Sequence, residues 1–511
     1  MSLLNRNLII ILSLILGVSI AFGISTKADL ANLAEGDSLS SFSVVNLWVD
    51  EVNEPVGARF IDHRYGFIVD LLSIQSVPQG FFWVKTPPKW DKGEPHTCEH
   101  LVLGKGNKGR DVAALQQMTL GKSSASTGQL LTSYHFNAVT GKDSFYELFE
   151  AKLTDLLHPD FTNEEIRREV CHVGVVENED GSFSLDEKGT VYTEMVSGYE
   201  KPWAYLYNTM EDMLYGDTHP LANSSGGDPK AIRTMVPEDL WKFHRDFYQL
   251  SNMGIIVSIP QDIPISECLG TLSEILEKSY GDSLETSAQI DPDKLQSFGI
   301  GKLDLPKPQQ AQPKGTVKIV DFPSENPHVP GQILYGWAPE LDLDLIEIML
   351  FELFLDSFSG GPTSILYDVF QNSETKTVDF DVTFIYGSVS DQIGNPIYFD
   401  IGMTDNSNVN PDMIEDVKDI ILNEIRKVSE WEDGSIELKK FNEDAISRLE
   451  GWKKWCRSIL DSPPMFGFRR GGAGRWLNTL RDVEKQEGFR KSIARKHLVE
   501  AHLPPEFHLS L

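Results

Sequence analysis

The sequence predicts an α+β fold arranged as two similar units, and three observations lead to this prediction. Apolar runs of strand length recur along the chain, and segments of helical length lie between them. Residues 281–315 shift in composition to Gln, Pro, Asp and Ser, with closely spaced prolines, as is typical of a linker between domains. The strand and helix signals before this linker recur after it, which indicates a second unit of similar content.

The chain of 511 residues begins with a segment typical of an export signal. A charged start at Arg6 precedes an apolar run from Leu8 to Phe22, and small residues follow at Gly23 and Ala28. Because this run is shorter than the roughly 20 apolar residues of a spanning helix, we interpret residues 1–28 as a signal peptide. An uncleaved N-terminal anchor is the alternative. The mature chain is therefore expected to be exported, either periplasmic or secreted.

Residues 44–280 are predicted to form the first unit. Apolar runs at residues 66–74 and 80–85 predict two strands that pair with each other. Pro95 then stands where the first turn of a helix tolerates proline, so a helix is expected to follow the second strand. Further helical segments extend to about residue 250, and residues 253–259 predict another strand.

The segment His96-Thr97-Cys98-Glu99-His100 is the strongest chemical signal in this unit. Two histidines four residues apart lie on one face of a helix, where both imidazoles can bind a single zinc ion. Zinc lowers the pKa of a bound water toward roughly 7, and Glu99 is placed to accept the proton of that water as a general base. Cys98 points away from His96 on such a helix, so we expect a packed thiol. The motif predicts metal-assisted hydrolysis.

Residues 316–430 are predicted to form the second α+β unit. It is expected to begin with a strand at residues 316–322 and to continue through a long apolar helix at about residues 341–358. Residues 431–511 are predicted to be a helical C-terminal segment.

Composition excludes some classes of partner. The formal net charge of −30, from 46 basic and 76 acidic residues, argues against binding to nucleic acid or to an anionic membrane surface, because both require positive faces. Beyond the signal peptide or an N-terminal anchor, we expect no association with membranes. Four cysteines permit disulfides in an exported protein, but the sequence selects no pairing.

Several motifs together resemble the N-terminal half of the presequence proteases, which belong to the pitrilysin/insulysin (M16) group of zinc peptidases. The resemblance covers roughly residues 45–460, and the motifs that carry it are Thr86-Pro87-Pro88, His96 to His100, Phe136-Asn137-Ala138, Gly189 to Met195, Ser225 to Pro229 and Phe243-His244-Arg245. It implies two similar domains, each an antiparallel-rich sheet covered by helices. It also implies one zinc ion per chain, with Glu194 as the third ligand beside His96 and His100.

The resemblance implies further roles that have ordinary structural alternatives. Asn137 and Ala138 match a strand whose edge lies along the bound peptide, although both are also common strand or turn residues. Glu187 and Glu169 are candidates to orient a metal ligand, and a solvated acidic surface is their alternative role. Residues 225–229 are expected to form a structural turn.

The function predicted from these features is that of a zinc-dependent metalloendopeptidase that hydrolyses short unfolded peptides. Presequence proteases are about twice as long as this chain, and their second half closes over the zinc-bearing half. The resemblance therefore implies a homodimer, a separately encoded partner, or a missing second half. The alternative is a catalytically weak peptide-binding or scaffold half-subunit that needs a partner chain for activity.

Overall fold

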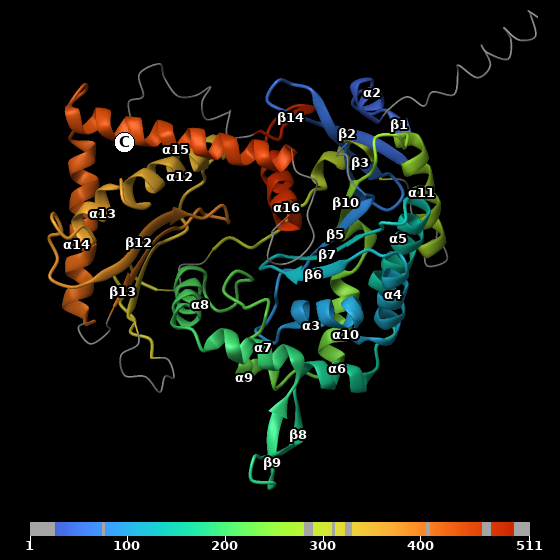
Figure 1. The fold of residues 1–511 in the computed structure, drawn as a ribbon, viewed down its shortest axis with the longest axis horizontal. Coiled ribbons are helices and arrows are strands. Elements are labelled where there is room, and N and C mark those ends of the chain that lie inside the picture. The colour runs from blue at the N-terminus through green and yellow to red at the C-terminus, as the bar shows by residue number, and fades with distance from the viewer. Residues whose placement is uncertain are drawn as a thin grey trace, which may run out of the picture.

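The structure is a computed structural model, and it confirms an α+β chain (Figure 1). It describes residues 26–73, 77–280, 290–308, 312–321, 330–404, 409–461 and 472–494. Nearly all of the predicted signal peptide, residues 1–25, lies outside these ranges. Within them, no helix is both long enough and apolar enough to cross a membrane.

The first unit is built on a large mixed sheet. Its strand order is β1-β2-β3-β4-β10-β5-β7-β6, and β14 lies beside β2. Most neighbours are antiparallel, but β10 runs parallel to β4 and β14 runs parallel to β2. The strands are β1 (Ser38–Leu39), β2 (Phe42–Val49), β3 (Pro55–Asp62), β4 (Ile68–Leu72), β5 (Gln79–Lys85), β6 (Ser123–Thr127), β7 (Leu131–Asn137), β10 (Met253–Ser258) and β14 (Arg490–Ser492).

The predicted pairing of β4 with β5 is wrong, because β10 lies between these strands. Gly254 of β10 pairs with Ile68 on one side and with Trp83 on the other. A Cβ atom at Gly254 would lie 2.5 Å from the Trp83 ring and 2.7 Å from the Ile68 carbonyl, so only glycine fits there. A strand buried on both faces is apolar throughout, and its pattern therefore does not reveal which strand becomes its neighbour.

Helices follow the strands along the chain, and several cover one face of this sheet. They are α2 (Thr26–Ala31), α3 (Glu94–His100), α4 (Asn107–Met118), α5 (Lys142–Leu157), α6 (Asn163–Val170), α7 (Thr190–Tyr199), α8 (Pro202–Tyr215), α9 (Pro229–Ile232), α10 (Pro237–Phe247) and α11 (Ile265–Tyr280), with short helical turns at Leu101–Lys105, Leu250–Asn252 and Pro292–Ser297. Between α6 and α7 along the chain, the hairpin of β8 (His172–Glu177) and β9 (Phe183–Lys188) projects away from the body of the molecule (Figure 1).

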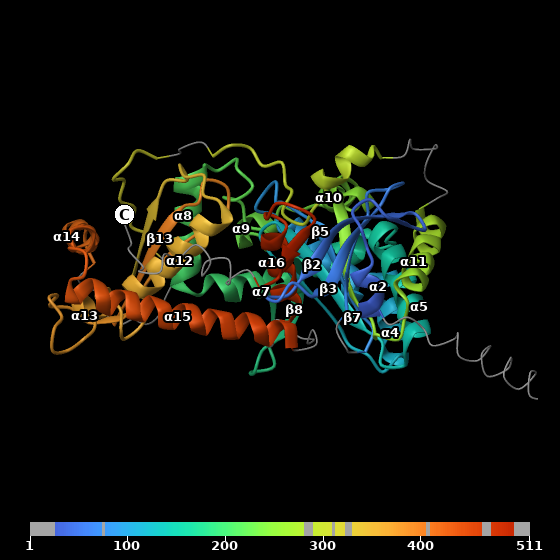
Figure 2. The same cartoon turned by 90° about the horizontal axis from the view of Figure 1, so that it is seen from above.

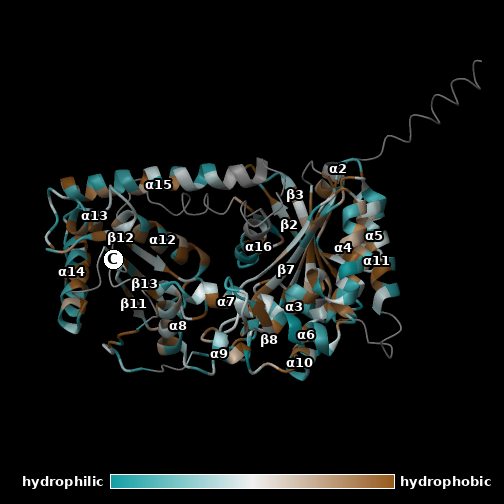
Figure 3. Cartoon of the chain, turned by 60° about the horizontal axis from the view of Figure 1, so that its bottom comes forward, coloured by the Kyte–Doolittle hydropathy of each residue, from teal (hydrophilic) through white to brown (hydrophobic). Residues whose placement is uncertain are grey.

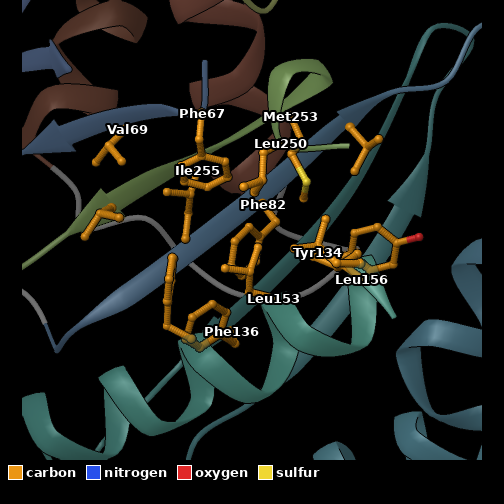
Figure 4. Packing of buried hydrophobic residues seen from close by; sticks show 14 of the residues in the cluster. Phe67, Val69, Phe82, Tyr134, Phe136, Leu153, Leu156, Leu250, Met253 and Ile255 are labelled. Carbon is orange, nitrogen blue, oxygen red and sulfur yellow. The ribbon is translucent and has the colours of Figure 1, made fainter. Parts of the chain in front are cut away.

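The main core lies between the sheet and the helices α5 and α11. Phe82 and Phe136 stack with ring centroids 6.0 Å apart, and Leu153 and Leu156 of α5 pack against the same cluster (Figure 4). Full burial of one such side chain contributes about 1.5–3 kcal/mol to folding. Figure 3 shows that the outer helices α6 and α10 present mostly hydrophilic residues. Cys98 is buried in this core as predicted, and the described cysteines Cys98, Cys171 and Cys268 are free thiols.

The other face of the sheet is covered by segments that the sequence assigned elsewhere. Leu295 and Ile300, within the predicted linker, pack against the sheet residues Trp48 and Trp83. The helix α16 (Gly472–Val483), within the predicted C-terminal segment, packs on the same face, and β14 extends the sheet. Parts of residues 281–315 and 431–511 therefore complete the first unit, because its second face was too apolar to remain exposed.

A buried ion network holds α16 to the sheet. Arg59 of β3 pairs with Asp70 of β4 at 2.8 Å and with Glu484, just after α16, at 2.6 Å. The Glu484 carboxylate also accepts a hydrogen bond from the backbone N–H of Ile300 at 3.0 Å. Burial of charges is costly unless each is paired, and here every partner comes from a different segment.

The second unit contains a sheet of order β11-β13-β12 among the described residues. Its strands are β11 (Gln332–Trp337), β12 (Val382–Val389) and β13 (Ile397–Met403), and its helices are α12 (Leu345–Ser359), α13 (Ile365–Phe370), α14 (Pro411–Ser429) and α15 (Ile436–Asp461). The apolar helix predicted at about 341–358 is confirmed as α12, which begins at a capping box between Asp344 and Glu347.

The strand predicted at residues 316–322 is wrong over its described part, 316–321, which has no regular secondary structure. Val317 and Ile319 are 43% and 60% exposed, so no neighbouring strand buries them. Their alternation with polar residues matches a strand, but a strand also requires a partner.

Helix α8 joins the two units, although its sequence lies within the first. The hydroxyl of Tyr207 donates to Asp400 of β13 at 3.1 Å, and the hydroxyl of Tyr398 donates to Glu211 of α8 at 3.0 Å. On another side, α15 packs against α12 and extends as a long rod toward the first unit (Figure 2). The hydrogen bonds of α8 therefore tie the second unit to the first.

Candidate active site

Helix α3 carries His96, Glu99 and His100, as the sequence predicted. Gly93 precedes the helix with φ of 75°, and a Cβ atom there would lie 2.6 Å from the Gly226 carbonyl, so glycine is required. The rings of His96 and His100 have centroids 4.7 Å apart and are nearly perpendicular. One turn of helix thus presents both imidazoles on one face.

Glu194, on α7, brings the third candidate ligand to this pair. Its Oε2 atom lies 3.3 Å from Nε2 of His96 and 3.5 Å from Nε2 of His100. A tetrahedral zinc ion with bonds of roughly 2.0–2.1 Å holds its ligand atoms about 3.3 Å apart. Among the described residues, His96, His100 and Glu194 form a group able to hold a metal ion, and its donor set and spacing fit zinc.

The electrostatics of the two histidines differ. Burial, followed by repulsion from His100, lowers the pKa of His96 and favours its neutral form. Burial also lowers the pKa of His100, but the hydrogen bond with Glu169 and the charges of Glu194 and Glu99 outweigh it and raise the pKa. A metal ion requires both rings to be neutral at the ligating nitrogen.

Glu99 lies beside these ligands and is almost fully buried. Burial raises its pKa above the ordinary glutamate value, and the hydroxyl of Thr127 opposes this shift by donating to its Oε2 atom at 2.6 Å. A carboxylate with a raised pKa and one fixed oxygen has the properties of a general base.

The two predicted supporting glutamates have different contacts. Glu169 of α6 lies 3.4 Å from Nδ1 of His100, so it is placed to orient that ring. Glu187 instead pairs with Arg233 at 2.6 Å and accepts a hydrogen bond of 2.6 Å from Tyr192. From β9, Glu187 thus holds α7 and the segment after α9 together, and among the described residues it makes no hydrogen bond or ion pair with a histidine.

A cavity of about 650 Å³ opens over the three candidate ligands and Glu99. It is lined by His96, Glu99, His100, Leu103, Gly104, Lys105, Ser126, Thr127, Thr190, Glu194, Met195 and Gly226. Gly226 belongs to the predicted turn at residues 225–229, where Asp228 caps α9. The cavity therefore joins α3, α7 and the strand β6.

The expected peptide-binding edge at Asn137 and Ala138 is not an edge. Both belong to β7 or follow it directly, and β7 is paired on both sides, with β5 and β6. Ala138 is fully buried and its N–H donates to the carbonyl of Pro78 at 3.0 Å. The outermost strand at this end of the sheet is β6, whose Ser126 and Thr127 line the cavity.

Thr127 and the rest of β6 carry no signal of their own that predicted them as part of the site. Residues 123–127 read Ser-Ser-Ala-Ser-Thr, which carries little of the apolar alternation that identifies a strand. The available signal was the spacing to β7, because only residues 128–130 separate the two and this length is typical of a hairpin.

Comparison with known sequences finds relatives, although no family model matches the chain. An uncharacterised protein of Saccharomyces cerevisiae is 29% identical over 287 residues, which are 54% of this chain and 26% of that protein. The mitochondrial presequence protease of Candida albicans is 30% identical over 38% of this chain and 18% of its own length. Presequence protease 1 of Arabidopsis thaliana is 27% identical over 68% of this chain and 30% of its own length. The matched part is therefore less than a third of each of these relatives.

Solved structures share the fold. A protease from Helicobacter pylori matches with a TM-score of 0.55 and 16% identity over 87% of this chain and 90% of its own. An inactive M16 peptidase domain from Pseudomonas fluorescens matches with a TM-score of 0.53 and 13% identity over 91% and 96% of the two chains. Pitrilysin matches with a TM-score of 0.51 and 12% identity over 90% of this chain but only 45% of its own. In sequence the chain is thus similar to part of the presequence proteases, and it shares its fold with M16 peptidases and with 45% of pitrilysin.

Proposed function

We propose that the chain is a zinc-dependent metalloendopeptidase that hydrolyses short unfolded peptides. The observation that carries this proposal is the convergence of His96, His100 and Glu194, with ligand atoms 3.3 and 3.5 Å apart, beside the buried carboxylate of Glu99. Two imidazoles, one carboxylate and an adjacent base are the residue types that metal-assisted hydrolysis requires.

Each side chain has a role in this proposal. His96, His100 and Glu194 would hold one zinc ion, and the chemistry that zinc supplies there is Lewis acidity toward water and the scissile carbonyl. Glu99 accepts a proton from the attacking water and delivers it to the leaving amine. Thr127 keeps one oxygen of Glu99 fixed, and Glu169 orients His100.

The substrate is proposed to be an extended peptide that lies along β6. This strand is outermost at its end of the sheet, and Ser126 and Thr127 place it at the wall of the cavity. An extended peptide adds to such an edge by backbone hydrogen bonds, so unfolded chains are favoured over folded ones.

Two expectations from the sequence remain proposals about the protein in its cell. We propose that the chain is exported, on the basis of its N-terminal apolar run. We also propose that a second copy or a separate partner chain closes the cavity, because the fold corresponds to 45% of pitrilysin.

The test is metal content and peptide hydrolysis of the full chain, wild type beside Glu99→Gln, at several protein concentrations. We expect one zinc per chain in both proteins and hydrolysis reduced by roughly 10²–10⁴-fold in the variant. A steep dependence of specific activity on protein concentration would indicate a dimer. A wild-type chain that binds no zinc would refute the proposal.

A catalytically weak peptide-binding half is the second candidate function. It is favoured by the match to an inactive M16 domain over 91% of this chain. Zinc bound by the wild-type chain without hydrolysis at any concentration, together with peptide binding, would support this candidate. Hydrolysis restored by an added second chain would assign the activity to the pair.

A further inference from the structure

A second cavity, of about 520 Å³, adjoins the first and carries side chains that the proposed hydrolysis does not use. Gly104, Lys105 and Thr190 line both cavities. The contact of 3.4 Å between His100 and Glu169 stands between them, because His100 lines the first and Glu169 the second. The full lining of the second cavity is Gly104, Lys105, Arg110, Arg168, Glu169, His172, Gly189 and Thr190.

The lining of this cavity is cationic, in contrast to the chain as a whole. Lys105, Arg110 and Arg168 outnumber its one carboxylate, Glu169, whereas the chain carries 46 basic and 76 acidic residues. Arg110 is paired with Glu165 at 2.7 Å. Lys105 and Arg168 are exposed and form no salt bridge within the described ranges. The charge of Lys105 acts on Glu169, so Arg168 is the positive charge that a ligand meets with the least competition.

Two further features lie at this cavity. His172, the first residue of β8, lines it, although its Nδ1 atom is closed off from solvent and has no hydrogen-bond partner in the described part of the chain. Helix α7 begins at Thr190, and its N-cap, Gly189, provides no side-chain cap. A Cβ atom at Gly189 would lie 2.4 Å from the Val170 carbonyl, so no capping side chain fits there. Gly189 and Thr190 both line the cavity, so the positive end of α7 faces it, and Glu169 already accepts a hydrogen bond from the Thr190 side chain there.

We infer that this second cavity binds a carboxylate of the peptide substrate, held by Arg168 and Lys105. The inference rests on the proposed function, because it assumes that a peptide occupies the adjoining first cavity. Carboxylates are the anionic groups of an unmodified peptide, and either the C-terminus or an Asp or Glu side chain near the cleaved bond supplies one. A charge-assisted hydrogen bond from Arg168 would give preference for such peptides.

The test measures binding rather than turnover, with the zinc-loaded full chain carrying Glu99→Gln. The probes are forms of one short fluorescein-labelled peptide: a free or amidated C-terminus, and Glu or Gln at flanking positions. Fluorescence anisotropy gives the affinity of each form for this background and for the same background with Arg168→Gln. Arg167→Gln is the matched control, because Arg167 is the exposed neighbour on α6 and lines neither cavity.

We expect one carboxylate-bearing form to bind about tenfold more tightly than its neutral counterpart. Arg168→Gln should abolish this difference, and Arg167→Gln should retain it. Weaker binding of the amidated peptide identifies the C-terminus as the group bound. Weaker binding of the peptide with Gln in place of Glu identifies a side chain. Equal affinity for all forms, a preference that survives Arg168→Gln, or no binding of any form would overturn the inference.

This design separates the inference from the proposed function. A charge preference that depends on Arg168, in a chain whose wild type hydrolyses nothing, would retain the carboxylate site and refute the peptidase. Hydrolysis by the wild type without any charge preference in binding would support the peptidase and refute the carboxylate site.

Discussion

The carboxylate of Glu169 lies 3.4 Å from Nδ1 of His100, and Nε2 of the same ring lies 3.5 Å from Glu194. The two nitrogens of His100 therefore face different carboxylates. The pKa of Glu169 is lowered, since hydrogen bonds from His100 and Thr190 outweigh the effect of its burial. An ionised Glu169 accepts the Nδ1–H bond, which leaves the lone pair of Nε2 directed toward the candidate metal position.

Replacement of Glu169 by Gln should weaken zinc binding. Removal of an outer partner of a ligating histidine typically lowers metal affinity by roughly 10–100-fold. Zinc affinity is measured by competition with a chelator. Glu164→Gln is the control, because Glu164 lies on the same helix and is exposed. Equal zinc affinity in wild type and Glu169→Gln would show that the contact does not orient the ring.

Replacement of Thr127 by Val should move the pH dependence of hydrolysis. Glu99 acts as a base only when ionised, and burial already raises its pKa. The hydrogen bond from Thr127 favours the ionised form, so its loss raises the pKa further. Hydrolysis is present above the pKa of Glu99 and lost below it. As the pH falls, the variant should therefore lose hydrolysis at a higher pH than the wild type does.

The measurement for Thr127→Val is kcat/KM as a function of pH. The acidic limb should shift upward, and the activity at high pH should approach that of the wild type. Ser126→Ala serves as the control, because the hydroxyl of Ser126 contacts Ser133 at 3.0 Å rather than Glu99. An unchanged acidic limb would contradict the role given to Thr127.

Replacement of Glu484 by Ala should destabilise the first unit. The change leaves Arg59 buried with one partner instead of two, and it removes the acceptor for the N–H of Ile300. Loss of one partner of a buried pair costs about 3–5 kcal/mol. Denaturant unfolding measures the free energy, and Glu487→Ala is the exposed control. A variant as stable as this control would mean that the network does not hold α16 to the sheet.

The sequence predicted local features well. Spacing and caps within a few residues determine three of the predicted elements. These are the helix that carries His96 and His100, the apolar helix α12 and the strand β10. A four-residue interval alone places two histidines on one helical face. The presence of Glu194 beside them was implied only by resemblance, because it lies 94 positions after His100 and 98 after His96, and no local rule connects residues so far apart.

Tertiary structure decided the pairings between distant segments. It placed β10 between β4 and β5, made β6 rather than β7 the outer strand, and returned α16 to the back of the sheet. It also brought Lys105, Arg168 and His172 together around one cavity. The order of apolar and polar residues in a segment indicates how deeply the segment is buried and whether its buried positions repeat as in a strand or as in a helix. It does not record which partner buries it, because apolar burial is non-directional and many partners satisfy it equally.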